Sequence, residues 1–448
     1  MKLLLTHGYF LEEDPKERAI MKPYPPLGCL YLSSHLRRAG FDVEIYDSTF
    51  GSKAELFEIL RHGPPAALGI YGTLMTRANV LEIAAQARAC GWRIVIGGPE
   101  PANYAAEYLA AGADVIIAGE GETPLQELLG CGMDPAAWPT IPGLLFRADD
   151  GVLVRTPPSP LISNLDTQPW PDRERIDISR YLDTWRRHHG RGSVSLITAR
   201  GCPYKCNWCS HAVYGNTHRR RSPTGVVDEV EWILDRYAPE MLWIADDVFT
   251  IHHGWLFAYA AEMRRRNLRI PFECITRADR VNAPVAEALA SLGCFRVWIG
   301  SESGSQRILD AMDRGVTVEQ VRAAVELCRA NGIQTGMFLM WGYDGEEIED
   351  IEATIAHVKR CRPDVCLTTV SYPIKGTGYY KRVQERLVSV RAWSESTDRE
   401  YRIRGRHSRR FYRHADDLLR SELADPPDAA AVAAARAGLH ACSAEVEA

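Results

Sequence analysis

The sequence predicts an α/β fold built from two successive sheets, and two observations support this. Short apolar runs alternate with helical patterns over residues 1–140, and the alternation resumes near residue 194. Glycine-rich turns follow several of the apolar runs. Continuous apolar strands separated by helices are typical of parallel sheets that are covered on both faces. We therefore expect a doubly wound, Rossmann-like parallel sheet first and a second α/β domain after it.

In the first half of the chain, helices separate five apolar runs. The expected strands cover residues 2–6, 41–47, 67–71, 93–98 and 115–118. The expected helices cover residues 30–39, 54–61, 77–90, 104–111 and 124–129. Doubly wound sheets bind ligands at the carboxyl ends of their strands, so the turns that follow these strands are the place to look for a site.

The second half repeats the alternation with six strands, each followed by a helix or a loop. These strands are expected at residues 194–198, 240–245, 272–277, 295–300, 334–340 and 365–372. We expect four segments in all, with bounds 1–140 (the first sheet), 141–192 (a proline-rich linker with a small hairpin near Gly151), 193–385 (the six-stranded core) and 386–448 (a helical tail).

The composition is that of an ordinary globular protein. The 448 residues are enough for two or three domains with cores of their own. Hydrophobic residues make up 46% and charged residues 25% of the chain, and the formal net charge is −5. This charge does not indicate a nucleic acid or an anionic membrane as a partner, and we expect neither.

Cysteine usage indicates a reducing compartment. Nine of the 12 cysteines are scattered singly, and the apolar run at Met1–His7 is too short for a signal peptide or a membrane span. We therefore expect a cytoplasmic protein without disulfides.

The other three cysteines form the most informative motif. Cys202, Cys206 and Cys209 are spaced C-x3-C-x2-C directly after the apolar run at residues 192–197. Iron–sulfur clusters are normally held by four cysteine thiolates, so three ligands would leave one iron open to a substrate or cofactor. Alternatives are a zinc site with His211 as the fourth ligand, disulfides, or buried structural cysteines.

This stretch resembles the cluster loop of the radical S-adenosylmethionine (SAM) superfamily, and Trp208 before the last cysteine fits the same pattern. The resemblance implies a [4Fe-4S] cluster on Cys202, Cys206 and Cys209, with SAM bound to the open iron. It also implies that the six strands form a partial (β/α)6 barrel with its chemistry at the carboxyl ends of the strands.

The turns of the first half resemble the cobalamin-binding domain that is fused to many radical SAM enzymes. The residues that carry this resemblance, and would contact cobalamin, are Tyr71, Gly72, Thr73, Leu74, Gly97, Gly98, Pro99, Gly119, Glu120, Gly121 and Glu122. The cobalt-ligating D-x-H-x-x-G motif of mutase-type domains is missing after the first strand, where the chain reads Thr6–Leu11 with a single His7. We expect cobalamin without a protein histidine ligand. An alternative is that the domain has lost the cofactor.

Polar residues at the strand ends of the second half resemble the SAM contacts of the superfamily. The residues in question are Trp208, Asp246, Arg277, Glu302, Ser303 and Gly342. A zwitterionic amino acid head needs both an anion and a cation nearby, ribose hydroxyls need an acceptor, and adenine is read by backbone amides beside glycine.

The resemblance implies an enzyme that methylates an unactivated carbon of a small-molecule substrate. A 5′-deoxyadenosyl radical would abstract hydrogen, methylcobalamin would supply the methyl group, and an external donor such as flavodoxin or ferredoxin would supply electrons. Two alternatives stay open. The same cofactors could drive cyclisation, oxidation or rearrangement without methyl transfer, or the chain could be a non-catalytic cobalamin or SAM sensor.

Overall fold

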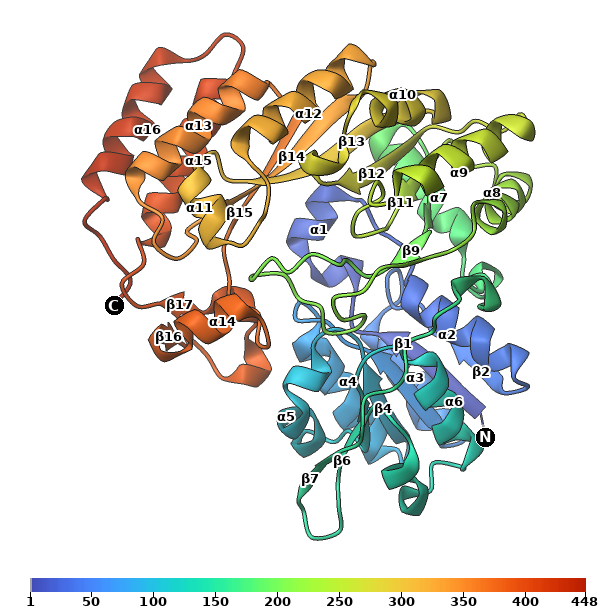
Figure 1. The fold of residues 1–448 in the computed structure, drawn as a ribbon. Coiled ribbons are helices and arrows are strands. Elements are labelled where there is room, and N and C mark those ends of the chain that lie inside the picture. Colours follow the sequence, from blue (N-terminus) through green and yellow to red (C-terminus); the bar gives the residue numbers. More distant parts are fainter. Residues whose placement is uncertain (1) are drawn as a thin grey trace. The chain divides into compact units, whose positions relative to one another are not determined.

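The computed structural model describes residues 2–448, and the chain folds into two units (Figure 1). The first unit contains residues 1–203, 210–242 and 391–397. The second contains residues 204–209, 243–390 and 398–448. The segment 204–209, which includes two of the three motif cysteines, is therefore part of the second unit.

A seven-stranded sheet forms the first unit, with strand order β2-β1-β3-β4-β5-β6-β7. The strands are β1 (Lys2–His7), β2 (Asp42–Ile45), β3 (Ala67–Tyr71), β4 (Arg93–Gly97), β5 (Val115–Ile117), β6 (Leu144–Arg147) and β7 (Leu153–Arg155). The strands from β2 to β5 pair in parallel, which confirms the doubly wound prediction. The hairpin β6–β7 continues the sheet by antiparallel pairing, so the expected hairpin belongs to the first sheet and makes it mixed.

Side chains of the first sheet alternate between two cores. Leu4, Leu68 and Ile94 pack in one core, whereas Leu3 and Val95 pack in the other. Successive side chains of a strand point to opposite faces, so a strand with continuous apolar sequence fills both cores.

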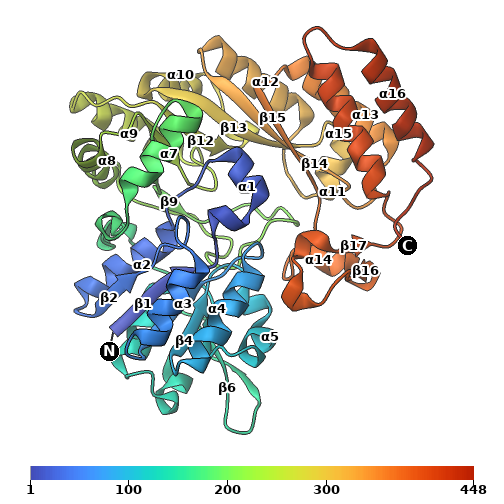
Figure 2. The same ribbon diagram turned by 180° about the vertical axis from the view of Figure 1, so that it is seen from behind.

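Helices cover this sheet, as Figure 2 shows from the back for α3 and α4. The helices of the first unit are α1 (Pro15–Ile20), α2 (Leu27–Arg38), α3 (Lys53–His62), α4 (Arg77–Ala89), α5 (Ala105–Ala110), α6 (Glu122–Gly130), α7 (Ile178–His189) and α8 (Pro223–Tyr237). Helix α7 lies in the segment expected to be a linker, and sequence analysis missed it. Asp177 caps it, and its buried Tyr181 and Trp185 bond to Asp47 and to the carbonyl of Pro23.

The second sheet has six strands in the order β15-β14-β13-β12-β11-β8. The strands are β8 (Ser193–Leu196), β11 (Met241–Ile244), β12 (Phe272–Thr276), β13 (Cys294–Glu302), β14 (Gln334–Trp341) and β15 (Val365–Val370). Pairing from β12 to β15 is parallel, and helices follow these strands in sequence, as the barrel prediction requires.

The second unit also contains eight helices among its described residues. They are α9 (His253–Arg265), α10 (Ala283–Leu292), α11 (Gln306–Ala311), α12 (Val318–Ala330), α13 (Ile348–Cys361), α14 (Gly378–Val383), α15 (Arg409–Leu423) and α16 (Ala429–Ala441). Helices α15 and α16 lie side by side (Figures 1 and 2). The basic tail therefore folds against the barrel, where Phe411 and Leu418 share a core with Leu339 and Ile355.

Short elements complete the fold. Two-residue strands form the pairs β9 (Ala199–Arg200) with β10 (Arg219–Arg220) and β16 (Leu387–Val388) with β17 (Arg402–Ile403). Single 3-10 turns lie at Leu11–Glu13, Pro101–Asn103, Pro135–Thr140, Leu165–Thr167, Arg173–Arg175, Ala278–Arg280, Gln384–Arg386, Trp393–Glu395 and Asp398–Glu400. Within residues 2–448, none of the helices has the length and apolar character that crossing a bilayer requires.

Candidate active site

The cysteine motif lies on the loop between the short strands β9 and β10. Cys202 is half-buried, Cys206 is buried and Cys209 is exposed, and none of the three forms a disulfide. Across residues 2–448, no three His, Cys, Asp or Glu side chains converge closely enough to hold a metal ion. In an iron–sulfur cluster each cysteine ligates a different iron, so the three thiols need not converge on one metal ion.

Asn207, between two of the cysteines, anchors the loop in the second unit. Its backbone N–H donates to Met312 O at 3.1 Å, and its side-chain amide donates to Ala311 O at 2.8 Å. Its carbonyl oxygen accepts from the N–H of Tyr379, and its side-chain oxygen accepts from the hydroxyl of Tyr343. Sequence analysis missed this residue because an asparagine inside a loop carries no signal for partners more than 100 positions away.

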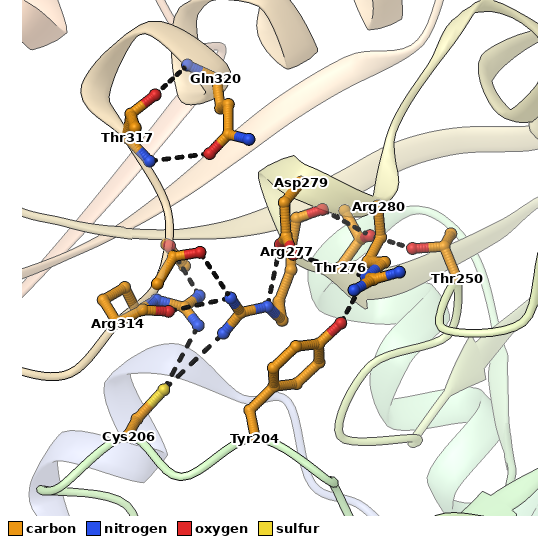
Figure 3. A network of polar contacts seen from close by, with 12 residues as sticks. Tyr204, Cys206, Thr250, Thr276, Arg277, Asp279, Arg280, Arg314, Thr317 and Gln320 are labelled. Carbon is orange, nitrogen blue, oxygen red and sulfur yellow. Dashed lines mark hydrogen bonds and ion pairs between the residues drawn. The ribbon is translucent and has the colours of Figure 1, made fainter.

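Two buried arginines bind the sulfur of Cys206 (Figure 3). Nη1 of Arg277 and Nη1 of Arg314 each donate to Cys206 Sγ at 3.7 Å. The guanidinium of Arg277 also stacks on the ring of Tyr204, 3.6 Å from its centroid. The structure thus brings the predicted residue Arg277 to the cluster loop, together with Arg314, which the sequence did not single out. Trp208 of the same loop packs beside a core that contains Met312 and Tyr343.

Glu302 ends strand β13 in a left-handed backbone conformation with φ +61°. Its Oε1 lies 3.8 Å from Nε of Arg314, and burial raises the pKa of its carboxyl although Arg314 and Arg277 oppose the shift. Ser303 is bonded inside the protein, to the hydroxyl of Thr354. Asp246 is buried after β11. The predicted SAM residue Glu302 therefore lies beside the arginine pair, which includes the predicted residue Arg277.

The turn after β14 is built around Gly342, which has φ +70°. A Cβ at this position would lie 2.8 Å from the ring of Tyr412, so only glycine fits. The backbone N–H of Gly342 donates to Oε2 of buried Glu346, and its carbonyl accepts from the hydroxyl of Ser371. Burial raises the pKa of Glu346 to about 8.

In the first unit, glycines lie at the carboxyl ends of strands β3 and β4. The N–H of Gly72 donates to the carbonyl of Gly97 at 2.8 Å, and Gly98 has φ +114° with its Cα against Gly72. Thr73 bonds to Thr76, which closes the turn that carries half-buried Leu74. Tyr71, Gly97, Gly98 and Pro99 are likewise only half-buried, so this edge leaves backbone within reach of a ligand.

His7 at the end of β1 is held inside the protein on both ring nitrogens. Nε2 lies 3.1 Å from Oδ1 of Asp47, and Nδ1 accepts the N–H of Tyr9 at 3.3 Å. Burial alone would raise the pKa of Asp47, but hydrogen bonds from His7 and Tyr181 lower it overall. With both nitrogens engaged, His7 does not present a free lone pair to a metal.

The predicted turn at Gly119–Glu122 forms buried ion pairs with the base of the cysteine loop. Arg200, directly before the loop, bonds to Glu120 and to Glu122 at 2.7 Å each. Arg219, directly after it, bonds to Glu120 at 2.7 Å. The two carboxylates that the sequence offered as cofactor ligands are therefore engaged by arginines, and this turn has only its backbone left for a ligand.

The donor groups fit the cofactors implied by the sequence. Three cysteines on one loop, with two guanidiniums facing one of them, suit an anionic iron–sulfur cluster. The glycine-lined edge of the first sheet suits a large flat ligand at the carboxyl ends of parallel strands.

Comparison with protein families gives two matches. Residues 196–358 match the radical SAM superfamily, and residues 19–129 match the B12 binding domain. The first match contains all three motif cysteines, and the second contains the turns after β3, β4 and β5.

The chain is also similar to individual proteins over most of its length. The chain is 27% identical to the "Uncharacterized methyltransferase PH0819" of Pyrococcus horikoshii, over 86% of this chain and 84% of the relative. It is also 27% identical to the anaerobic magnesium-protoporphyrin IX monomethyl ester cyclase of Rubrivivax gelatinosus, over 76% of this chain and 63% of the relative.

Among solved structures, the radical SAM methyltransferase TsrM of Kitasatospora setae, which holds cobalamin and a [4Fe-4S] cluster, shares the fold. The TM-score is 0.70 at 22% identity, over 86% of this chain and 74% of that one. The chain thus carries a B12 binding domain ahead of a radical SAM domain, the two domains of a cobalamin-dependent radical SAM enzyme, and the cofactors that these domains take are a [4Fe-4S] cluster, SAM and cobalamin.

Proposed function

We propose that this enzyme methylates an unactivated carbon of a small-molecule substrate. The observation that carries the proposal is the pairing, in one chain, of a B12 binding domain with a radical SAM domain that contains the three motif cysteines. The similarity to a methyltransferase of Pyrococcus horikoshii over most of both chains supports it.

In this proposal the cysteines hold the cluster and leave one iron to SAM. When bound, the cluster supplies the electron that cleaves SAM, and cobalamin carries the methyl group. An external donor such as flavodoxin or ferredoxin delivers the electron. Cys202, Cys206 and Cys209 are the ligands, and Asn207 fixes the loop between the last two of them.

The strand ends of the second unit bind SAM. Gly342 offers its backbone at a turn where no side chain fits, which suits the edge of adenine. Glu302 and Asp246 supply carboxylates, and the indole of Trp208 closes the loop side. Ser303, whose hydroxyl bonds to Thr354, contributes through its backbone.

The first unit binds cobalamin at the edge formed by the turns after β3 and β4. Tyr71, Gly72, Thr73 and Leu74 would hold the cofactor together with the backbone of Gly97–Pro99. The turn Gly119–Glu122 would contribute backbone groups. His7 is bonded to Asp47 and Tyr9, so this proposal gives it no role as a cobalt ligand.

A second candidate is cyclisation, oxidation or rearrangement without methyl transfer. The similarity to the Rubrivivax gelatinosus cyclase, at the same identity as the methyltransferase, favours keeping it. The two candidates differ in what becomes of SAM, because only methyl transfer converts SAM into S-adenosylhomocysteine.

The test is to incubate the anaerobic holoenzyme with SAM, cobalamin and a chemical reductant and to quantify both nucleoside products. Methyl transfer predicts S-adenosylhomocysteine together with 5′-deoxyadenosine, whereas the second candidate predicts 5′-deoxyadenosine alone. Cys206→Ala is expected to abolish 5′-deoxyadenosine formation, and Cys90→Ala, a half-buried thiol outside the motif, to leave it unchanged. A Cys206→Ala protein that still cleaves SAM would refute the assignment of the motif cysteines as ligands of the cluster that cleaves it.

A further inference from the structure

Cys206 differs from the other motif cysteines in its surroundings. It is buried, and the guanidiniums of Arg277 and Arg314 both donate to its sulfur at 3.7 Å (Figure 3). Two cations against one sulfur repel each other and lose hydration, and such burial is costly unless the group between them carries negative charge. A thiolate that ligates iron is such a group.

The protein holds Arg277 rigidly in this position. Its Nε donates to Asp279 at 2.9 Å, and its Nη2 donates to the carbonyl oxygens of Arg314 at 2.9 Å and Gly315 at 3.4 Å. The ring of Tyr204 covers one face of the guanidinium. Four N–H groups of the five in a guanidinium are thus directed at Asp279, Cys206 and two carbonyls.

Arg314 is held from the other side. Its Nη2 donates to the carbonyl of Gly300 in β13 at 2.9 Å, and its Nε lies 3.8 Å from Oε1 of Glu302. Its own carbonyl accepts from Arg277, so the two arginines form one unit. Neither side chain is more than 8% exposed.

We propose that Arg314 and Arg277 are positioning residues that make the cluster easier to reduce, acting through the sulfur of Cys206. Reduction adds one electron, taken from the external donor, to a cluster that its thiolates already make negative. Hydrogen bonds and positive charge at a ligating sulfur stabilise the reduced state more than the oxidised state, so they raise the reduction potential. The inference rests on the proposed cluster ligands but not on methyl transfer.

A different role for the same arginines is to bind the carboxylate of SAM. The two roles predict different results for protein without SAM, because a residue that acts only on SAM leaves the potential of the SAM-free cluster unchanged. Potential and SAM affinity therefore have to be measured on the same variants.

The test compares the wild type with Arg314→Gln, Arg314→Lys and Arg280→Gln. Arg280 is the matched control, because it bonds to the hydroxyl of Tyr204 in the same network and donates nothing to Cys206 among the described contacts. Reconstituted, SAM-free protein is poised at a series of potentials, and the reduced cluster is followed by electron paramagnetic resonance. Iron content and circular dichroism check that each variant is folded and carries its cluster.

We expect Arg314→Gln to shift the midpoint potential to more negative values, Arg314→Lys to shift it less in the same direction, and Arg280→Gln to leave it at the wild-type value. If Arg314→Gln does not retain its cluster, the result for Arg314→Lys decides. Unchanged potentials with weakened SAM binding would overturn the inference in favour of the SAM-carboxylate role, and unchanged potentials with unchanged SAM binding would overturn it as well. Neither result affects the proposed methyl transfer, which depends on S-adenosylhomocysteine formation.

Discussion

At the scale of single residues, Glu346 of the second unit is unusual because it is a buried carboxyl with a raised pKa. It is buried, its Oε2 accepts the N–H of Gly342, and its Oε1 has no hydrogen-bond partner. Burial and the nearby Asp350 raise its pKa to about 8, although Gly342, Arg307 and Arg406 act in the opposite direction. The folded protein therefore holds a proton on Glu346 at neutral pH.

This residue makes stability depend on pH. Between pH 4.5, the ordinary pKa of the carboxyl, and about 8, the folded state keeps a proton that the unfolded state has released, so stability decreases as pH rises through this window. Glu346→Gln resembles the protonated form and cannot titrate. We expect the melting temperature of the variant to rise relative to the wild type from pH 5 to pH 9.

Thermal unfolding at each pH checks this expectation. Glu349→Gln, an exposed carboxyl in the first turn of helix α13 just after Glu346, is the matched control and should follow the wild type. If the melting temperatures of Glu346→Gln and the wild type instead changed with pH in the same way, Glu346 would be ionised in the folded protein.

Single residues were also where sequence analysis reached its limit. Glycines at strand ends could be predicted as parts of a site, because a turn that approaches a ligand closely favours glycine. Arg314 and Asn207 could not be predicted, because the residues that they contact lie far away from them in the sequence. The ion pairs of Glu120 and Glu122 could not be predicted either, because their partners Arg200 and Arg219 lie far away from them in the sequence.

At the scale of elements, the ribbon β9–β10 is the base of the cysteine loop. Glu120 bonds to Arg200 at one end of the loop and to Arg219 at the other, and it also accepts the N–H of Ile162 at 2.8 Å. All three ionised side chains are almost fully buried. One carboxylate of the B12 binding domain therefore fixes both ends of the loop that carries the cluster ligands.

Glu120→Gln should destabilise the first unit strongly. Removing the charge leaves Arg219 without its carboxylate and Arg200 with Glu122 alone, and breaking a buried ion pair in this way costs about 3–5 kcal/mol. Chemical denaturation measures the loss, and hydrogen exchange over residues 201–218 should become faster. Glu44→Gln, which removes an exposed pair with Lys2, should cost at most about 1 kcal/mol. Equal effects of the two substitutions would contradict a structural role for Glu120.

Regular elements could be predicted well where one pattern dominates. The six strands of the second sheet and the five parallel strands of the first all follow from apolar runs between helices. Helix α7 was missed because its aromatic and basic residues looked like a polar linker, and the attachment of β6–β7 to the first sheet depends on pairing with β5 that no local pattern specifies.

At the scale of the whole molecule, each of the two units is made of segments that are not continuous in the sequence. The segment Arg391–Thr397 belongs to the first unit, although the residues on both sides of it belong to the second. Trp393 lies on the guanidinium of Arg77, 4.9 Å from it, and meets Tyr108 edge-on. The carbonyls of Trp393 and Ser396 accept from Arg77, so this arginine, beside the expected corrin edge, is engaged by the tail and by Glu100.

The central claim is that one chain carries a cluster on Cys202, Cys206 and Cys209 with an iron open to SAM, and cobalamin on its own domain. Anaerobic reconstitution with iron, sulfide and hydroxocobalamin tests it, read by metal analysis, visible absorption and electron paramagnetic resonance. We predict about four irons and one cobalamin per chain, a resonance of the reduced cluster that changes when SAM is added, and a triple Cys→Ala variant that keeps cobalamin but no iron. A wild-type protein without a cluster, or with a cluster whose resonance does not respond to SAM, would contradict the account.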